Sequence, residues 1–98
     1  MYKVVTSDLK SLGLRKNPNI LVFPLNIWVN EPNPLKGNKD SGGIWVTRHK
    51  FNATKLLKYM KKKGIECRIF RCLIGNVLYE NSYRLKTDRV MLCEEINN

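Results

Sequence analysis

The sequence predicts an α+β fold, in which a mainly antiparallel, curled sheet of about five to six strands packs against one principal amphipathic helix after the third strand. Three observations support this class. Short strand-like segments occur on both sides of the middle of the chain, one segment has a strong helical pattern, and turn residues separate the elements. The chain has 98 residues, which is enough for one modest core, so residues 1–98 are expected to form a single domain.

The first half of the chain contains the three strand-like segments that precede the helix. Residues 2–5 read as a short first strand, and residues 21–29 carry alternating apolar side chains that would form one face of a sheet. Pro24 cannot donate a ladder hydrogen bond, so this second strand is expected to lie at an edge or to carry a bulge. Residues 43–47 form the third segment and could pair with the second as a long-looped hairpin.

Residues 30–42, between the second and third strands, contain two prolines and two glycines and show no periodicity. A loop of this length is unusual in a compact domain unless it has a function, so it is a candidate for a mobile functional flap. At the other end of the chain, residues 97–98 are expected to fray.

The helix signal begins at Asn52, the predicted N-cap, and ends at Gly64, the predicted C-terminal stop. In this register Phe51 and Leu56 occupy the two positions of a hydrophobic staple. The apolar stripe of the helix consists of Ala53, Leu56, Leu57 and Met60, and the opposite, basic face consists of Lys55, Lys58 and Lys62.

The second half of the chain returns to strand-like patterns. Residues 67–74 predict a strand, and Gly75 with Asn76 predicts a two-residue hairpin turn into a further strand at residues 77–79. Residues 83–86 extend or follow that arm. A second turn at residues 87–88 precedes residues 90–93, whose apolar run predicts a buried central strand.

The formal charge of +10 is concentrated in one region: residues 48–71 contain nine basic residues and one acidic residue. Such regional basicity favours an anionic partner, because a requirement for solubility would distribute the charge more evenly. Arg48 and Lys50 also lie near the predicted helix start, where the backbone favours an anion. The residues predicted to bind nucleic acid are Arg48, Lys50, Lys55, Lys58, Lys62, Arg68, Arg71, Trp28 and Trp45.

Trp28 and Trp45 are both out of phase with the apolar residues of their strands, so both point away from the face that those residues define. If the two strands pair, the indoles could share one surface and provide stacking platforms for bases. The alternative is that the helix covers this face, which would place both rings in the core, where large aromatic side chains are mostly found.

These observations favour a small basic module that binds nucleic acid, with RNA or single strands favoured because no duplex-reading motif is present. One alternative is a small regulatory protein that docks its basic helix on an acidic protein surface and forms a homodimer through a sheet edge. The other is an enzyme acting on a phosphate-rich substrate, either a ribonuclease or a nucleotide-dependent transferase, with residues 30–42 as its lid.

Several site classes lack a signature in the sequence. No catalytic motif is present, so no catalytic residue and no cofactor are predicted. Cys67, Cys72 and Cys93 form no C-x-x-C pair, so they are interpreted as reduced thiols and no metal site is assigned. The apolar stretches are too short for a bilayer span and no signal-type segment begins the chain, which predicts a cytoplasmic protein with no membrane partner.

Overall fold

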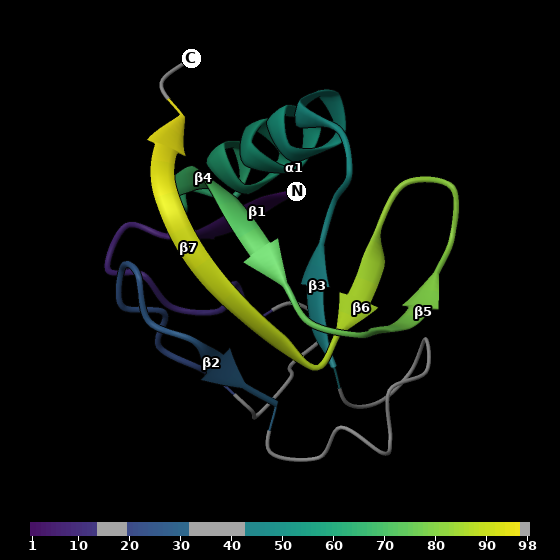
Figure 1. Cartoon of the computed structure of the whole chain (residues 1–98). Coiled ribbons are helices and arrows are strands. Elements are labelled where there is room, and N and C mark those ends of the chain that lie inside the picture. Colours follow the sequence, from purple (N-terminus) through teal and green to yellow (C-terminus); the bar gives the residue numbers. More distant parts are fainter. Residues whose placement is uncertain (14–19, 32–42, 97–98) are drawn as a thin grey trace.

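The computed structural model describes residues 1–13, 20–31 and 43–96 of the chain. These residues form one helix and seven strands in two antiparallel sheets (Figure 1), which confirms the predicted α+β class and the place of the helix after the third strand. From residue 32 onward the predicted flap at 30–42 lies outside the described residues, as does the predicted frayed tail at 97–98. In the part of the chain that is described, no helix is long and apolar enough to cross a membrane.

The larger sheet has four strands in the order β1-β4-β7-β2, and the smaller has three in the order β3-β6-β5. The strands of the larger sheet are β1 (Tyr2–Thr6), β4 (Cys67–Ile74), β7 (Arg89–Ile96) and β2 (Val29–Asn30). Those of the smaller sheet are β3 (Ile44–Val46), β6 (Leu85–Thr87) and β5 (Val77–Glu80). The helix α1 (Lys50–Lys62) follows β3.

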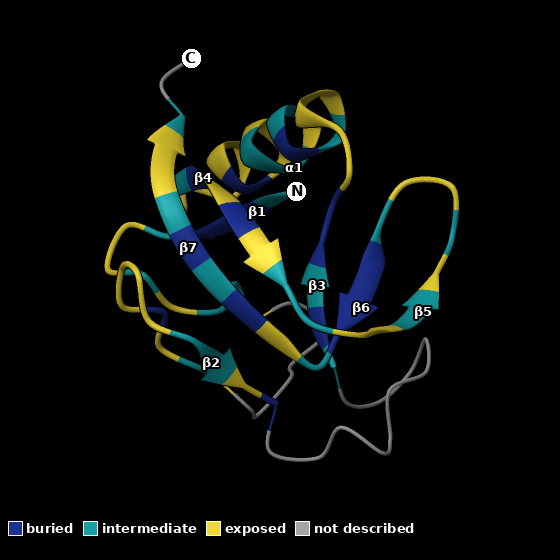
Figure 2. Ribbon diagram, in the orientation of Figure 1, coloured by how far each residue is buried: buried dark blue, intermediate teal, exposed yellow. Residues whose placement is uncertain are grey.

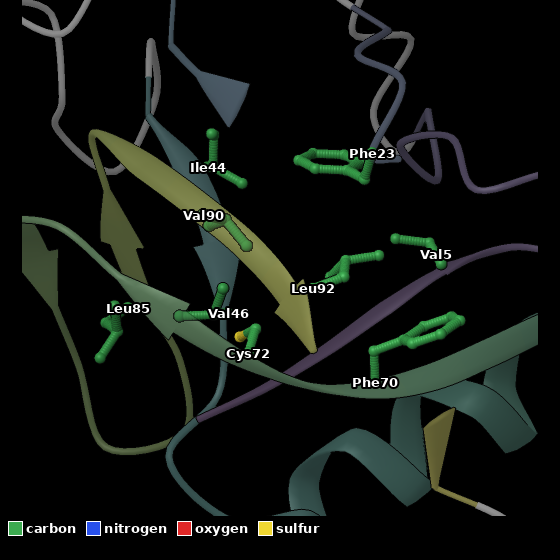
Figure 3. Packing of buried hydrophobic residues seen from close by; sticks show 9 residues of the cluster. All are labelled: Val5, Phe23, Ile44, Val46, Phe70, Cys72, Leu85, Val90 and Leu92. Carbon is green, nitrogen blue, oxygen red and sulfur yellow. The ribbon is translucent and has the colours of Figure 1, made fainter. Parts of the chain in front are cut away.

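The two faces of the larger sheet pack against different partners, because successive residues of a strand point to opposite faces. Val4 and Ile69 pack against Ala53 of α1. Val5 and Phe70 face a larger cluster that is shared with the smaller sheet (Figure 3). The other buried members of this cluster are Phe23, Ile44, Val46, Cys72, Leu85, Val90 and Leu92. The larger sheet therefore lies between α1 and the main core.

The predicted buried central strand at residues 90–93 is confirmed and extends over the whole of β7. This strand pairs with β4 on one side and with β2 on the other. Val90 and Leu92 are fully buried in the main core.

The predicted strand at residues 21–29 is wrong for most of its length, since only Val29 of this segment belongs to a strand, β2. Asn26 has a φ of 61°, which interrupts the extended conformation, and Pro24 lacks the N–H that a ladder needs. Of the alternating apolar residues, Phe23 alone is buried in the core, while Leu25 is exposed. The alternating residues therefore do not form a continuous strand, although Phe23 contributes to the core.

Both predicted hairpins are also wrong. β3 pairs with β6 and not with the preceding segment, and β4 pairs with β7 and not with β5. Gly75 and Asn76 instead carry the chain from the larger sheet to the smaller one. The Gly75 N–H donates to the Arg89 carbonyl at 3.0 Å, and a Cβ atom at Gly75 would lie 2.2 Å from an Asp88 carboxylate oxygen. The glycine at this position thus permits a close crossing of two segments.

The helix starts earlier than predicted: α1 begins at Lys50 with His49 as N-cap, so Asn52 is not the cap. Thr47 fixes this start, because its backbone exchanges two hydrogen bonds with Tyr2 of β1 and the chain turns directly afterwards. The new register also removes the predicted staple, and Phe51 is 66% exposed.

The predicted helix stop is confirmed. Gly64 has a φ of 79°, and the N–H groups of Gly64 and Ile65 donate to the carbonyls of Lys61 and Met60 at 2.9 and 3.1 Å. This pair of bonds is the Schellman motif, which favours glycine at the left-handed position.

Candidate nucleic-acid interface

The solvent-facing side of α1 carries four exposed residues in one narrow stripe: Phe51, Lys55, Lys58 and Lys62, here named the α1 face. At about 100° per residue these four positions fall within an arc of roughly 60°. The centre of the arc lies opposite the buried Ala53 and Met60. Figure 2 shows exposed, intermediate and buried segments on the ribbon of α1. The predicted basic face of the helix is therefore exposed, and Phe51 belongs to it.

Two exposed aromatic rings on α1 are each paired with a lysine four residues further along. The Lys55 Nζ lies 4.5 Å from the centroid of the Phe51 ring, and the Lys63 Nζ lies 4.7 Å from that of Tyr59. Tyr59 is 49% exposed. A ring beside an ammonium group offers a base a surface to stack on and its phosphate a cation to contact.

Phe51 and Tyr59 are absent from the site predicted from the sequence. The local pattern places the helix start too late and so assigns Phe51 to a staple in front of the helix. The four-residue spacing of Phe51 to Lys55 and of Tyr59 to Lys63 is the signal that could have found them, since residues four apart are neighbours on a helix surface.

The positive charge of α1 has no intramolecular counterpart in the described structure. The helix contains no acidic residue, and none of its lysines forms an ion pair with the residues that the structure describes. The helix dipole favours cations in the last turn, which accounts for Lys61 and Lys62 but not for Lys55 or Lys58. Lys50 is exposed too, but it lies about 100° from Phe51 around the helix, away from the α1 face.

The arginines of the predicted site differ from these lysines, because each is paired with a carboxylate. Arg48 and Glu80 form two hydrogen bonds, which raise the pKa of Arg48 and lower that of Glu80. Arg68 and Glu95 form two bonds at 2.8 and 3.0 Å, which raise the pKa of Arg68 and lower that of Glu95. These charges are largely compensated within the fold.

Arg71 is likewise paired, with Glu94 on the neighbouring strand β7. Because Arg68 and Arg71 are an odd number of positions apart in β4, they project from opposite faces of the sheet. Arg68 lies on the same face of β4 as Phe70, away from α1, so the structure does not bring both strand arginines together with the α1 face.

The tryptophans lie in separate places. Trp45 lies in β3, with the Arg84 guanidinium 3.8 Å and the Lys86 Nζ 4.7 Å from its ring centroid. Trp28 precedes β2, with the Arg89 guanidinium 4.5 Å from its ring. The condition for a shared platform, pairing of the two strands, is not met, and neither ring belongs to either core cluster. Each is half-buried against cationic side chains.

The three cysteines are free thiols, and burial raises the pKa of Cys72 to about 11. Within residues 1–13, 20–31 and 43–96, no three histidine, cysteine or carboxylate side chains come together in a way that could hold a metal ion. No further role for these thiols follows from their positions.

Comparisons of the chain with protein-family models, with curated proteins and with solved structures gave no match.

Proposed function

We propose that this protein binds single-stranded nucleic acid, with RNA favoured, through the α1 face. The observation that carries the proposal is a stripe in which three exposed lysines without an ion pair in the described structure accompany the exposed ring of Phe51. Each lysine can replace a counterion at a phosphate, and the ring can stack on a base.

The same stripe favours single strands over duplexes. An exposed ring can stack only on a base whose own face is free, and bases in a duplex are already stacked on their neighbours. From Phe51 to Lys62 the helix rises about 16 Å, so the α1 face can contact several successive nucleotides. The sequence predicts a cytoplasmic location for this chain. RNA is favoured because most single-stranded nucleic acid in the cytoplasm is RNA.

The test is a fluorescence-anisotropy titration with single-stranded and duplex RNA and DNA at low and physiological salt. We expect single strands to bind more tightly than duplexes of the same length, and binding to weaken as salt increases. Gel analysis of the products reports cleavage, which would favour the ribonuclease alternative. The proposal is wrong if no oligonucleotide binds at low salt, and a salt-sensitive complex with an acidic protein in that case would support the docking alternative.

A matched pair of variants separates the α1 face from net charge. Lys58→Gln with Lys62→Gln removes two charges from the α1 face, whereas Lys10→Gln with Arg71→Gln removes two charges that are paired with Asp8 and Glu94. We expect the first double variant to lose affinity for single-stranded RNA and the second to keep nearly all of it. Equal losses in the two would contradict a defined interface on α1.

A further inference from the structure

A polar pocket of about 190 Å³ lies between the start of α1 and the connection from β5 to β6. Arg48, His49 and Asn52 line it from the helix side, and residues 80–84 line it from the other. Its position is distinct from the α1 face, none of whose residues lines it.

Arg84 is the most unusual group of this pocket. Its guanidinium carbon lies 3.8 Å from the Trp45 ring centroid and 5.6 Å from the Tyr83 ring centroid. Its Nε is buried and has no hydrogen-bond partner, and no carboxylate of the described chain forms an ion pair with it. Because nearly all buried polar groups of native proteins have a hydrogen-bond partner, the unpartnered Nε sets Arg84 apart from the other residues of the pocket.

The pocket keeps a net positive charge although it contains a carboxylate. Glu80 is the acidic residue among those that line it, and both of its oxygens accept hydrogen bonds from Arg48. Arg48 thus neutralises Glu80, and the charge of Arg84 remains available for an anion.

The helix start adds a favourable dipole on the same side. His49, the N-cap, makes no side-chain hydrogen bond to the first turn, and that turn contains no acidic residue. The Asn52 N–H donates to the His49 carbonyl at 3.1 Å, so it is not free for a ligand, but the positive end of the helix dipole favours an anion here. His49 and Asn52 place this end of α1 at the pocket wall.

We propose that the pocket binds a terminal phosphate of a nucleic-acid strand, with the Arg84 guanidinium as the main contact and the rest of the strand along the α1 face. This inference rests on the proposed function. Guanidinium groups suit phosphate oxygens because two N–H donors can bond in parallel. The volume is below the roughly 300–1,000 Å³ of sites that enclose a whole small ligand, which favours one group at the end of a larger molecule.

The pocket and the α1 face are close enough to share one strand. Asn52 lies about 60° from Lys55 around the helix, so the pocket wall adjoins the stripe. A strand end held at Arg84 would have its next nucleotides beside Phe51 and Lys55.

The test compares three short single-stranded RNAs of one sequence: one with a 5′-phosphate, one with a 3′-phosphate and one with hydroxyl groups at both ends. We expect one phosphorylated form to bind about tenfold more tightly than the hydroxyl form, as a charge-assisted contact allows. Arg84→Gln should abolish this preference and leave the affinity for the hydroxyl form nearly unchanged. Arg84→Lys, which keeps the charge but not the two parallel donors, should retain only part of it.

Two control variants carry opposite expectations. Lys62→Gln should lower the affinity for all three RNAs by the same factor, and Arg71→Gln should leave all three affinities unchanged. Equal affinities for the three RNAs in the unmodified protein would overturn the inference. If the hydroxyl form still binds, and this binding requires Lys58 and Lys62, the proposed function is supported although the phosphate site at Arg84 is not.

A second measurement avoids substituting Arg84, whose stacking on Trp45 contributes to the fold. The Nε–H resonance of Arg84 is followed in the unmodified protein by NMR while inorganic phosphate, and separately a nucleoside monophosphate, is added. A saturable shift supports the site, and a resonance that does not move overturns it. If phosphate shifts the resonance but the protein binds no oligonucleotide, the proposed function is wrong. The assignment of the pocket to a strand end is then wrong as well.

Discussion

Lys3 lies in the interior, 7% exposed, although lysine is among the residues that proteins least often bury. Its Nζ donates to the Trp45 carbonyl at 2.7 Å and lies 4.9 Å from the centroid of the Phe23 ring. Desolvation lowers the pKa of Lys3 from 10.5 to about 8. Below pH 8 the folded protein therefore holds a charge in surroundings that disfavour it.

This environment predicts a pH dependence of stability. Between about pH 8 and 10.5 the unfolded state binds more protons at this site than the folded state, so the free energy of unfolding rises with pH. From pH 7 to pH 9 the gain from Lys3 should be about 1 kcal/mol. Urea denaturation of the protein and of Lys3→Met at both pH values measures it as the difference between the two.

Cys72 acts in the opposite direction, because its raised pKa makes the folded state bind more protons than the unfolded state above about pH 9. Both proteins contain this thiol, so its contribution is largely common to them. An equal change in stability between pH 7 and pH 9 in the two proteins would contradict a lowered pKa at Lys3.

Substitutions of Phe51 and Phe23 should have different effects, because Phe51 is 66% exposed and Phe23 is 1% exposed. Phe51→Ala should weaken binding of single-stranded RNA by about 1–3 kcal/mol, the contribution of one stacked base, with thermal unfolding almost unchanged. Phe23→Ala, in the main core, should lower the free energy of unfolding by about 3–5 kcal/mol. Anisotropy and calorimetry measure the two effects. Unchanged RNA affinity in Phe51→Ala would remove this ring from the interface.

At the level of elements, the two ends of α1 are finished differently. The C-terminal end has a complete Schellman motif, whereas the N-cap His49 has the extended backbone that a cap needs, φ −116° and ψ 133°, but no side-chain bond to the first turn. His49→Asn supplies an acceptor of the right length and should stabilise the protein by about 1 kcal/mol in urea denaturation. No gain would show that this N-terminus is already satisfied in another way.

The two ends of α1 also differ in how well the sequence predicts them: it predicts the C-terminal end correctly but not the N-terminal end. Gly64 acts through its own backbone conformation, so the stop can be read locally. The start depends on Thr47 pairing with Tyr2, a contact between distant segments that no local pattern contains. The strands β1, β4 and β7 can be predicted because their apolar patterns lie within short segments of the sequence. The pairing of β3 with β6 cannot, because it joins segments that are far apart in the chain.

The candidate site likewise has one part that the sequence predicts and one part that it does not. The exposure of Lys55, Lys58 and Lys62 follows from helical periodicity, which the sequence shows directly. The pairing of Arg68 with Glu95 follows from the register of β4 with β7, which places residues far apart in sequence side by side. The sequence therefore predicts which residues are charged but not which charges are already compensated.

For the molecule as a whole, this compensation concentrates the unpaired positive charge. The four ion pairs found among the described residues take up four of the eight acidic residues of the chain, and none of them involves α1. Among the described residues, α1, which packs on one face of the larger sheet, therefore carries lysines whose charge no ion pair compensates. A polyanion that approaches this side would be attracted at long range and then held by short-range interactions.

The most direct test of the α1 face as a binding surface is the salt dependence of its affinity for single-stranded RNA. For a single strand, the slope of log K against log salt changes by about 0.7 for each phosphate that the protein no longer neutralises. The triple variant Lys55→Gln, Lys58→Gln and Lys62→Gln should therefore have a slope smaller in magnitude by about 2 than that of the unmodified protein. The double variant Lys10→Gln and Arg71→Gln should keep the original slope. A triple variant with an unchanged slope would contradict the account, because the lysines of α1 would then neutralise no phosphate.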